Sequence, residues 1–196
     1  MGGIDHPGLR ISDCGKKVSR MTTQERSCLE SLDTVLRSEN VRKQLRPIVE
    51  RVRTELARKK AALMTWESVP LTIFGSALPA QIQSAWVFVL RAGADTGVER
   101  HPNSHQRMMS FEGSGDMRTG DPEQSQSNVL ISNQDAPMEQ RWISIPQNVW
   151  HRPVVGAAAD WAVISFHTVP AKELIEERPD HRANDRTKQM RYLQQK

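Results

Sequence analysis

No part of this chain restricts its fold and function as much as the stretch 93–113. It reads GADTGVERHPNSHQRMMSFEG and sets Glu99, His101 and His105 at odd positions. If the stretch is a strand broken by a Pro-Asn turn, all three side chains lean to one face. Imidazole nitrogen and carboxylate oxygen together suit iron, manganese, nickel, zinc and copper, and His151 in IPQNVWHRP is the candidate for a fourth ligand. The sequence therefore predicts a metal site.

Read together, these two stretches resemble the paired signature of the cupin superfamily. The first family motif runs Gly, five residues, His-x-His, three or four residues, Glu, six residues and Gly; the second carries Pro-x-Gly-x-x-His. Here five residues separate Gly93 from Glu99-Arg100-His101, and Pro146 and His151 stand at the spacing of the second motif. Asn148 replaces the glycine of that motif, a mild exchange because asparagine tolerates the left-handed backbone that glycine provides there.

The first motif departs further from the family pattern. Glu99 stands where the family has its leading histidine. The family glutamate falls on His105 by the three-residue spacing, or on Gln106 by the four-residue spacing, which also places Gly113 correctly. The sequence leaves both assignments open. The resemblance covers about residues 66–170, and it implies a small double-stranded β-barrel with one divalent metal ion in its mouth.

Short β-rich runs divided by turn residues follow from Trp66 onward. The strand candidates are 69–74, 85–91, 97–101, 106–112, 128–132, 141–145 and 161–168. The expected fold class is mainly β: a double-stranded β-helix, or jelly-roll, barrel preceded by an N-terminal helical segment. The expected organisation is a flexible leader (1–20), the helical segment (21–65), the barrel (66–170), and a C-terminal helical turn with a fraying tail (171–196).

The helical segment begins with a capping box from Thr22 to Glu25. An apolar stripe then runs from Val41 to Leu63, opposite a charged face. Pro47 falls inside it, so the helix either kinks there or a new helix starts there. We expect the stripe to dock on the barrel or on a second subunit of a homodimer. A DNA-binding helix-turn-helix is the alternative, although the chain lacks a tight Gly-containing turn between two short helices.

Composition excludes several classes of protein. The 196 residues are 37% apolar and 26% charged, as in an ordinary globular protein, and no run approaches the roughly 18 apolar residues of a membrane span. The net charge of +4 is spread along the chain and does not require a nucleic-acid partner. The amino terminus, MGGIDHPGLRISD, has no apolar core of a signal peptide, so we expect a cytoplasmic protein. Cys14 and Cys28 are far in sequence from the histidines and fit a reducing compartment.

Further residues are candidates for contact with a small-molecule substrate. In a strand that starts near His105, Arg107 and Met109 lie two and four residues after it. Their side chains would therefore point to the same face as His105, toward the barrel lumen. An inward Arg107 would bind a substrate carboxylate, and the alternative is a surface arginine. His167, near the end of the last strand candidate, is a candidate pocket residue.

The predicted function is that of a metal-dependent enzyme acting on a small organic molecule. Many cupins are dioxygenases, and we expect Fe(II) as the ion, with Mn, Ni or Zn as alternatives, although the resemblance itself does not identify the metal. If His105 ligates, the three-histidine set favours non-haem iron dioxygenases that oxidise thiols. If Glu99, His101 and His151 ligate, they form a two-histidine, one-carboxylate face. The alternatives are a redox-neutral isomerase or lyase, a ligand-sensing regulator, and a metal-free binding barrel.

Overall fold

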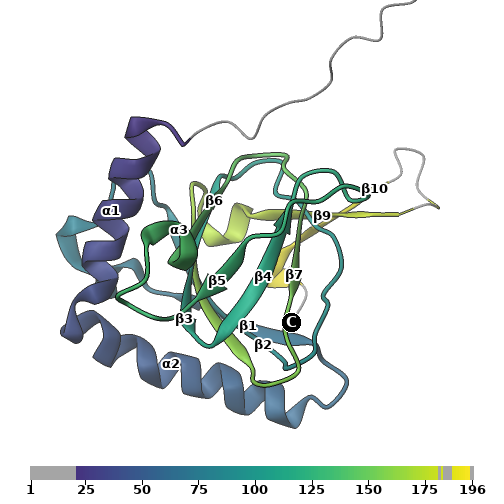
Figure 1. The fold of residues 1–196 in the computed structure, drawn as a ribbon, viewed down its shortest axis with the longest axis horizontal. Helices are drawn as coiled ribbons and strands as arrows, with labels where there is room; N and C mark the ends of the chain where they lie inside the picture. Colours follow the sequence, from purple (N-terminus) through teal and green to yellow (C-terminus); the bar gives the residue numbers. More distant parts are fainter. Residues whose placement is uncertain (1–20, 181, 183–186, 195–196) are drawn as a thin grey trace, which may run out of the picture.

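The structure is a computed structural model that describes residues 21–180, 182 and 187–194 of the 196-residue chain. The expected leader and Cys14 lie outside the described residues. Within them, two N-terminal helices precede an antiparallel β-barrel, and a C-terminal pair of strands lies against the barrel (Figure 1). The helices are α1 (Thr23–Arg37), α2 (Glu39–Arg58) and α3 (Met138–Arg141), with the 3-10 turns η1 (Leu71–Ala77), η2 (Ala171–Glu173) and η3 (Tyr192–Gln194).

The strands form three sheets. The five-stranded sheet has the order β1-β2-β8-β3-β6, the three-stranded sheet β5-β4-β7, and the two-stranded sheet β10-β9. The strand bounds are β1 Met64–Val69, β2 Ser84–Leu90, β3 Gln106–Glu112, β4 Ser114–Thr119, β5 Val129–Ile131, β6 Trp142–Ile145, β7 His151–Val154, β8 Trp161–His167, β9 Ile175–Pro179 and β10 Thr187–Arg191. The expected mainly β, jelly-roll barrel with N-terminal helices is confirmed.

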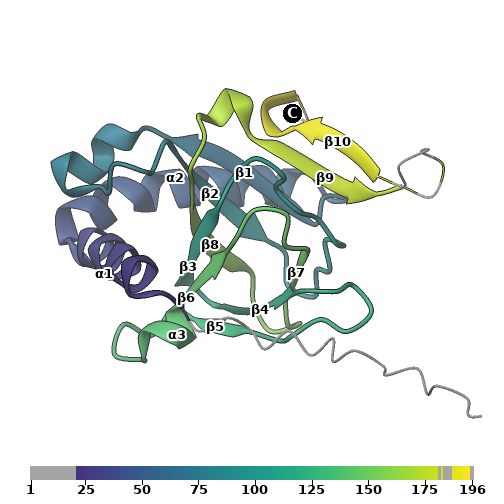
Figure 2. The same cartoon turned by 90° about the horizontal axis from the view of Figure 1, so that it is seen from above.

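The five-stranded sheet is buried on both of its faces. Along β2, Ala85, Val87 and Val89 pack against the helices, whereas Trp86 and Phe88 pack inside the barrel. Side chains alternate between the faces of a strand, so a strand with an apolar core on each side reads as a continuous apolar run, here SAWVFVL. The barrel interior lies between this sheet and the three-stranded one, which face each other in Figure 2.

The apolar stripe of the helical segment packs on the outer face of that sheet. Val41, Leu45, Val52 and Leu56 of α2 are all buried in the same core cluster as the outward residues of β2 and β8. Helix α2 runs through Pro47 without ending. The expected docking on the barrel is therefore observed within one chain. The N-terminus of α1 is capped by the Thr22 hydroxyl, which accepts a hydrogen bond from the Glu25 N–H.

The strand predictions differ from the structure at several places. Residues 71–77 form the 3-10 turn η1 rather than a strand, because Pro70 ends β1 and Gly75 takes a positive φ of 69°. Strands β4 and β7 were not predicted: β4 contains Gly115 and β7 contains Pro153, residues that disfavour strands in a local pattern.

The C-terminal segment also differs from the expectation. Instead of a helical turn and a fraying tail, the described residues form β9, β10 and η3, and the two strands pair antiparallel. Figure 2 shows this strand pair lying over one end of the barrel. In the described part of the chain, moreover, no helix combines the length and the apolar character needed to cross a lipid bilayer.

Helix docking gives a first prediction. Leu56 is 1% exposed in the core between α2 and the sheet, whereas Leu63, at the other end of the predicted stripe, is 46% exposed. We expect Leu56→Ala to lower the free energy of unfolding by about 3 kcal/mol, because it leaves a cavity in a packed core. Leu63→Ala, the matched control, should change it by less than about 0.5 kcal/mol. Chemical denaturation measures both, and equal effects would contradict this packing.

Candidate metal centre

Glu99 and His101 lie in an extended segment between β2 and β3. On one side Glu99 exchanges two backbone hydrogen bonds of 2.8 Å with His151 of β7. On the other side Arg100 exchanges two with Glu177 of β9, of 3.0 and 2.9 Å. Because side chains alternate along an extended chain, Glu99 and His101 are both buried in the barrel, whereas Arg100 is turned away from them.

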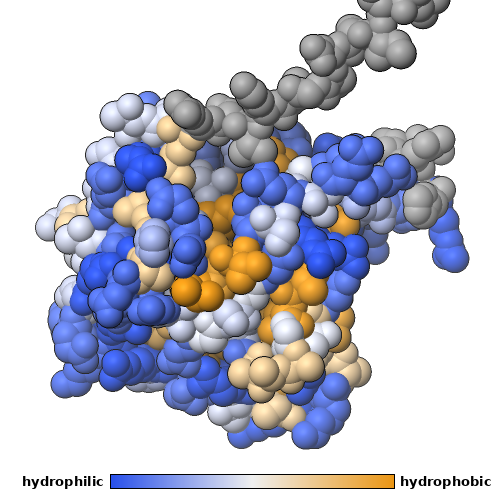
Figure 3. Space-filling model, in the orientation of Figure 1, coloured by the Kyte–Doolittle hydropathy of each residue, from blue (hydrophilic) through white to orange (hydrophobic). Residues whose placement is uncertain are grey.

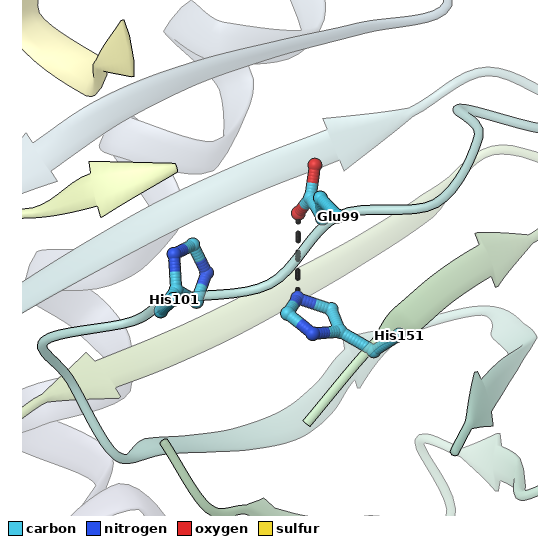
Figure 4. Close-up of side chains that lie close together, drawn as sticks. All are labelled: Glu99, His101 and His151. Atoms are coloured by element: carbon cyan, nitrogen blue, oxygen red, sulfur yellow. Dashed lines mark ion pairs between the residues drawn. The ribbon is translucent and has the colours of Figure 1, made fainter. Parts of the chain in front are cut away.

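The structure brings three of the predicted ligands together. Glu99, His101 and His151 each offer a ligand atom, and these atoms lie within 4.8 Å of one another. All three residues are at most 5% exposed. Figure 4 shows Glu99 and His101 on the extended segment close to His151 of the neighbouring strand, and the Glu99 Oε1 lies 3.5 Å from the His151 Nε2. We call these three residues the triad.

The motif-two turn positions His151. Asn148 has a φ of 63°, so the asparagine does adopt the left-handed conformation for which the family uses glycine. Its N–H donates to the His101 carbonyl at 3.1 Å, which joins the two motifs directly. Gly113, the last residue of motif one, has a φ of 78°, and a Cβ there would lie 2.6 Å from the Asp160 carbonyl oxygen.

Both histidines of the triad can offer their Nε2 atom to a metal ion. The His101 Nδ1 lies 2.9 Å from the Ile175 carbonyl, and the His151 Nδ1 lies 3.2 Å from the Val149 carbonyl. A carbonyl oxygen only accepts hydrogen bonds, so each Nδ1 carries a proton, and Nε2 is the atom that each ring can offer to a metal ion. Both Nε2 atoms are buried and have no hydrogen-bond partner among the residues that the structure describes. A metal ion bound by both Nε2 atoms would give each of them a partner, so the residues of the triad fit a metal ion.

The protonation states also suit a metal ion. Burial raises the pKa of Glu99, but the neighbouring His151 and Arg178 outweigh it and lower the pKa to about 2. The Arg178 Nη2 donates to the Glu99 Oε2 at 2.6 Å. Burial, together with the charge of His151, lowers the pKa of His101 to about 4. At neutral pH the carboxyl group is ionised and the His101 ring is neutral, as metal binding requires.

His105 and Arg107 lie outside this group. The His105 Nε2 lies 2.7 Å from the Ser144 Oγ, and Arg107 makes two 2.7 Å hydrogen bonds to Glu25 of α1. Neither residue lines the cavity beside the triad. The prediction that the odd-numbered residues of β3 face the barrel lumen was wrong. The Pro102-Asn103 turn interrupts the strand, and the odd-numbered side chains of β3 face the helices. Arg107 is neither a lumen nor a surface residue; it is a buried partner of α1.

Even residues of β3 face the barrel interior. Gln106 and Met108 line the cavity together with Glu99, whereas Met109, predicted to face the lumen, packs against the helices. The Gln106 Nε2 donates to the Ser165 Oγ at 3.0 Å, and its Oε1 is buried without a partner. Of the two candidates for the family's glutamate position, the structure brings Gln106 to the cavity.

His167 is buried beside the triad. Its Nδ1 lies 3.2 Å from the Ser104 Oγ and its Nε2 lies 3.0 Å from the Ser165 Oγ, so both ring nitrogens have partners. Its ring stands edge-on to that of His101 at a centroid distance of 5.1 Å. Burial, with the charges of neighbouring histidines, holds its pKa well below the usual value. His167 therefore supports the site as a neutral neighbour of His101.

Sequence reasoning missed two residues from the C-terminal segment. Arg178 of β9 binds Glu99 and also pairs with Glu176, and its Nη1 donates to the Thr96 carbonyl at 2.7 Å. Tyr192 of η3 is 2% exposed, and its hydroxyl lies 3.3 Å from the Glu99 Oε1. The signal that could have drawn attention to Tyr192 is that it is the only tyrosine of the chain and stands in a charged tail.

Comparisons with known proteins give distant likenesses only. No family model matches the sequence, and no curated protein matches it significantly. Among solved structures, the 11S globulin from Wrightia tinctoria has a TM-score of 0.45 at 16% identity, covering 60% of this chain and 27% of that one. The oxalate decarboxylase of Lactobacillus farciminis has a TM-score of 0.41 at 14% identity, covering 55% of this chain and 29% of that one.

CapF of Staphylococcus aureus has a TM-score of 0.42 at 11% identity, covering 54% of this chain and 26% of that one. This chain thus spans less than a third of the length of each of these three proteins. The fold assignment comes from the chain itself: the two antiparallel sheets enclose one core, and residues of both predicted motifs meet inside the barrel. The chain has the fold of the cupin superfamily, as its paired motifs predict.

Proposed function

We propose that this protein is a metal-dependent enzyme that acts on a small organic molecule in the barrel mouth. The observation that carries the proposal is the pair of buried Nε2 atoms of His101 and His151, which lack partners and lie beside an ionised carboxylate. In a protein interior, unpartnered polar atoms are costly, and two of them at one carboxylate indicate a ligand.

We infer that the ligand set is two histidines and one carboxylate. Such a face leaves several positions of an iron(II) ion open, and this donor set is typical of non-haem iron oxygenases. When bound, iron(II) would supply redox chemistry with dioxygen, whereas zinc would supply a Lewis acid alone. The chain's own contribution is to orient the two imidazoles through their Nδ1 bonds and to keep Glu99 charged through Arg178. The leading reaction class is therefore that of a dioxygenase.

The test compares two metal forms of the same protein. Protein without an affinity tag is purified without chelator, its metal content is measured, and the apoprotein is reloaded with iron(II) or zinc. We expect about one metal ion per chain and oxygen uptake by the iron form alone when thiol, enol or catechol compounds are offered. Turnover by the zinc form without oxygen would support an isomerase or lyase and overturn the dioxygenase. A protein that binds neither metal would overturn the whole proposal and favour a metal-free binding barrel.

A further inference from the structure

The ring of Tyr192 is enclosed by other aromatic rings inside the barrel. Its centroid lies 5.6 Å from that of Trp86, 5.7 Å from those of Trp66 and Phe88, and 5.9 Å from that of His101. We call Trp66, Trp86 and Phe88 the aromatic cage. These residues come from β1 and β2, whereas Tyr192 enters from the far end of the chain. The barrel thus holds a phenol ring that its own strands do not supply.

The hydroxyl of that phenol lies at the triad. It is 3.3 Å from the Glu99 Oε1, the same oxygen that lies 3.5 Å from the His151 Nε2. The other carboxylate oxygen is bound by Arg178. Tyr192 therefore places its ring in the aromatic cage and its oxygen on the ligand atom that the triad offers to a metal ion.

Little space remains while Tyr192 is in place. The cavity beside the triad, lined by Glu99, Gln106, Met108 and Tyr192 among others, has a volume of about 20 Å³. This is room for about one water molecule. Pockets that bind small organic molecules measure roughly 300 Å³ or more. An organic substrate therefore needs more space beside the triad than the cavity offers, and the departure of Tyr192 would provide it.

The segment that carries Tyr192 is attached through few elements. Among the described residues, β10 pairs with β9 alone, and the side chains of Lys188, Gln189 and Arg191 are exposed. Leu193, next to Tyr192, is 47% exposed. Besides the pairing of β10 with β9, the burial of Tyr192 is a contact that holds this segment on the barrel. A ligand that reproduces the contacts of the phenol can replace it.

The aromatic cage also has hydrogen-bonding capacity that Tyr192 does not use. Within the described ranges, the Nε1 atoms of Trp66 and Trp86 are buried without a hydrogen-bond partner, and so is the Oε1 of Gln106, which lines the neighbouring cavity. An indole N–H only donates, so a molecule with an acceptor group in addition to its ring and hydroxyl would satisfy a group that tyrosine leaves unsatisfied. These groups favour a phenol with a second oxygen over a plain phenol.

We propose that the substrate is a small hydroxylated aromatic compound of the catechol class, and that Tyr192 is a built-in plug that occupies the substrate's place until the substrate displaces it. The substrate class rests on the proposed function, because it assigns the molecule that would reach the metal ion. The plug depends only on the contacts of Tyr192. Residues 187–194 would then move out together when the substrate binds, since η3 directly follows β10.

The single tyrosine makes the displacement directly measurable. Incorporation of 3-fluorotyrosine labels residue 192 alone, because the chain contains one tyrosine. The full-length labelled protein is titrated with 4-methylcatechol and, separately, with 4-methylcyclohexanol, which has a similar size but no aromatic ring. We expect the catechol to convert the fluorine resonance of a buried ring into that of a solvent-exposed one, saturably, and the cyclohexanol to leave it unchanged. A resonance that stays buried at saturating catechol would overturn the plug.

A pair of variants tests the same competition by affinity. Tyr192→Ala removes the plug, and Leu193→Ala changes its exposed neighbour. We expect Tyr192→Ala to bind 4-methylcatechol at least about 10-fold more tightly than the wild type, because the competent state is no longer a minor one, while Leu193→Ala binds as the wild type does. Equal affinity in all three proteins would overturn the plug. The fluorine experiment needs no variant and decides the question even if Tyr192→Ala fails to fold.

Metal analysis of the same samples separates this proposal from the proposed function. If the protein binds stoichiometric metal but catechol does not displace Tyr192, the proposed substrate class is overturned and the proposal of a metal-dependent enzyme is retained. Displacement by catechol in a protein that binds no metal would support the plug and the aromatic cage and overturn the metal enzyme. Displacement in a metal-loaded protein supports both.

Discussion

His151→Ala should strip the protein of its metal while leaving the barrel folded. The variant reduces a three-residue ligand set to Glu99 and His101, and each lost ligand removes one of the bonds that offset dehydration of the ion. Outer-shell changes alone typically cost 10- to 100-fold in metal affinity, so the loss of a ligand should exceed about 100-fold. Elemental analysis after dialysis measures it, and circular dichroism checks the fold.

His105→Ala is the matched control for that variant. His105 is also a motif-one histidine, but its Nε2 contacts Ser144 on the helix-facing side of the sheet. We therefore expect His105→Ala to keep the metal content of the wild type. If His151→Ala still binds one metal ion per chain, the assignment of the triad as the metal ligands is contradicted. Equal metal loss in both variants would instead support the three-histidine ligand set, in which His105 also binds the metal ion.

The largest stability effect is expected at Asp33, where α1 meets the sheet. Its carboxylate accepts hydrogen bonds from Arg37 at 2.8 Å, from Arg141 at 2.9 Å and from the Trp142 Nε1 at 2.8 Å. Arg141 is 4% exposed, so Asp33→Ala would leave a buried guanidinium without its carboxylate. Breaking such a pair from one side costs about 4 kcal/mol. Chemical denaturation should show this loss, whereas Glu30→Ala, an exposed acid of the same helix, should change stability by less than about 0.5 kcal/mol.

The same residue predicts how stability depends on pH. Burial raises the pKa of Asp33, but the hydrogen bonds from Arg141, Arg37 and Trp142 outweigh it and lower the pKa from 3.8 to about 2. The carboxyl group therefore stabilises the fold fully above pH 3.8, and this contribution, about 2 kcal/mol, is lost as the pH falls through 2. The stability difference between the wild type and Asp33→Ala should shrink between pH 5 and pH 2. A difference independent of pH would contradict the lowered pKa.

Short-range signals in the sequence were sufficient for much of the fold. The helical stripe of α2 and the runs of β2, β3 and β8 are strong local patterns, because one periodicity extends over several turns or a whole strand. The second motif was equally local: Asn148 and His151 belong to one tight turn, so their spacing predicts their geometry.

The sequence did not reveal which side chains of β3 face the barrel interior and which face the helices. Counting odd positions from Glu99 through His105 assumes one continuous strand, and the Pro102-Asn103 turn breaks it. How far a turn rotates the chain depends on its backbone angles, and composition does not give them. The result was a misplaced His105 and Arg107, which lie on the face that packs against α1.

The role of the C-terminal segment depends on contacts between distant parts of the chain. Arg178 and Tyr192 meet Glu99 across 79 and 93 residues of sequence. A charged tail with one aromatic residue has no periodicity that would indicate such docking. The bridge between Arg100 and Glu177 joins β9 to the barrel, and the aromatic cage contacts Tyr192, and a local pattern contains neither contact.

The most direct test of this account is an anomalous diffraction map of the metal-loaded protein, recorded at the absorption edge of the bound metal. We expect one anomalous peak per chain, at about 2.0–2.2 Å from the Nε2 atoms of His101 and His151 and from the Oε1 of Glu99. A peak at His105, or a protein that holds stoichiometric metal without a peak among these three residues, would contradict it.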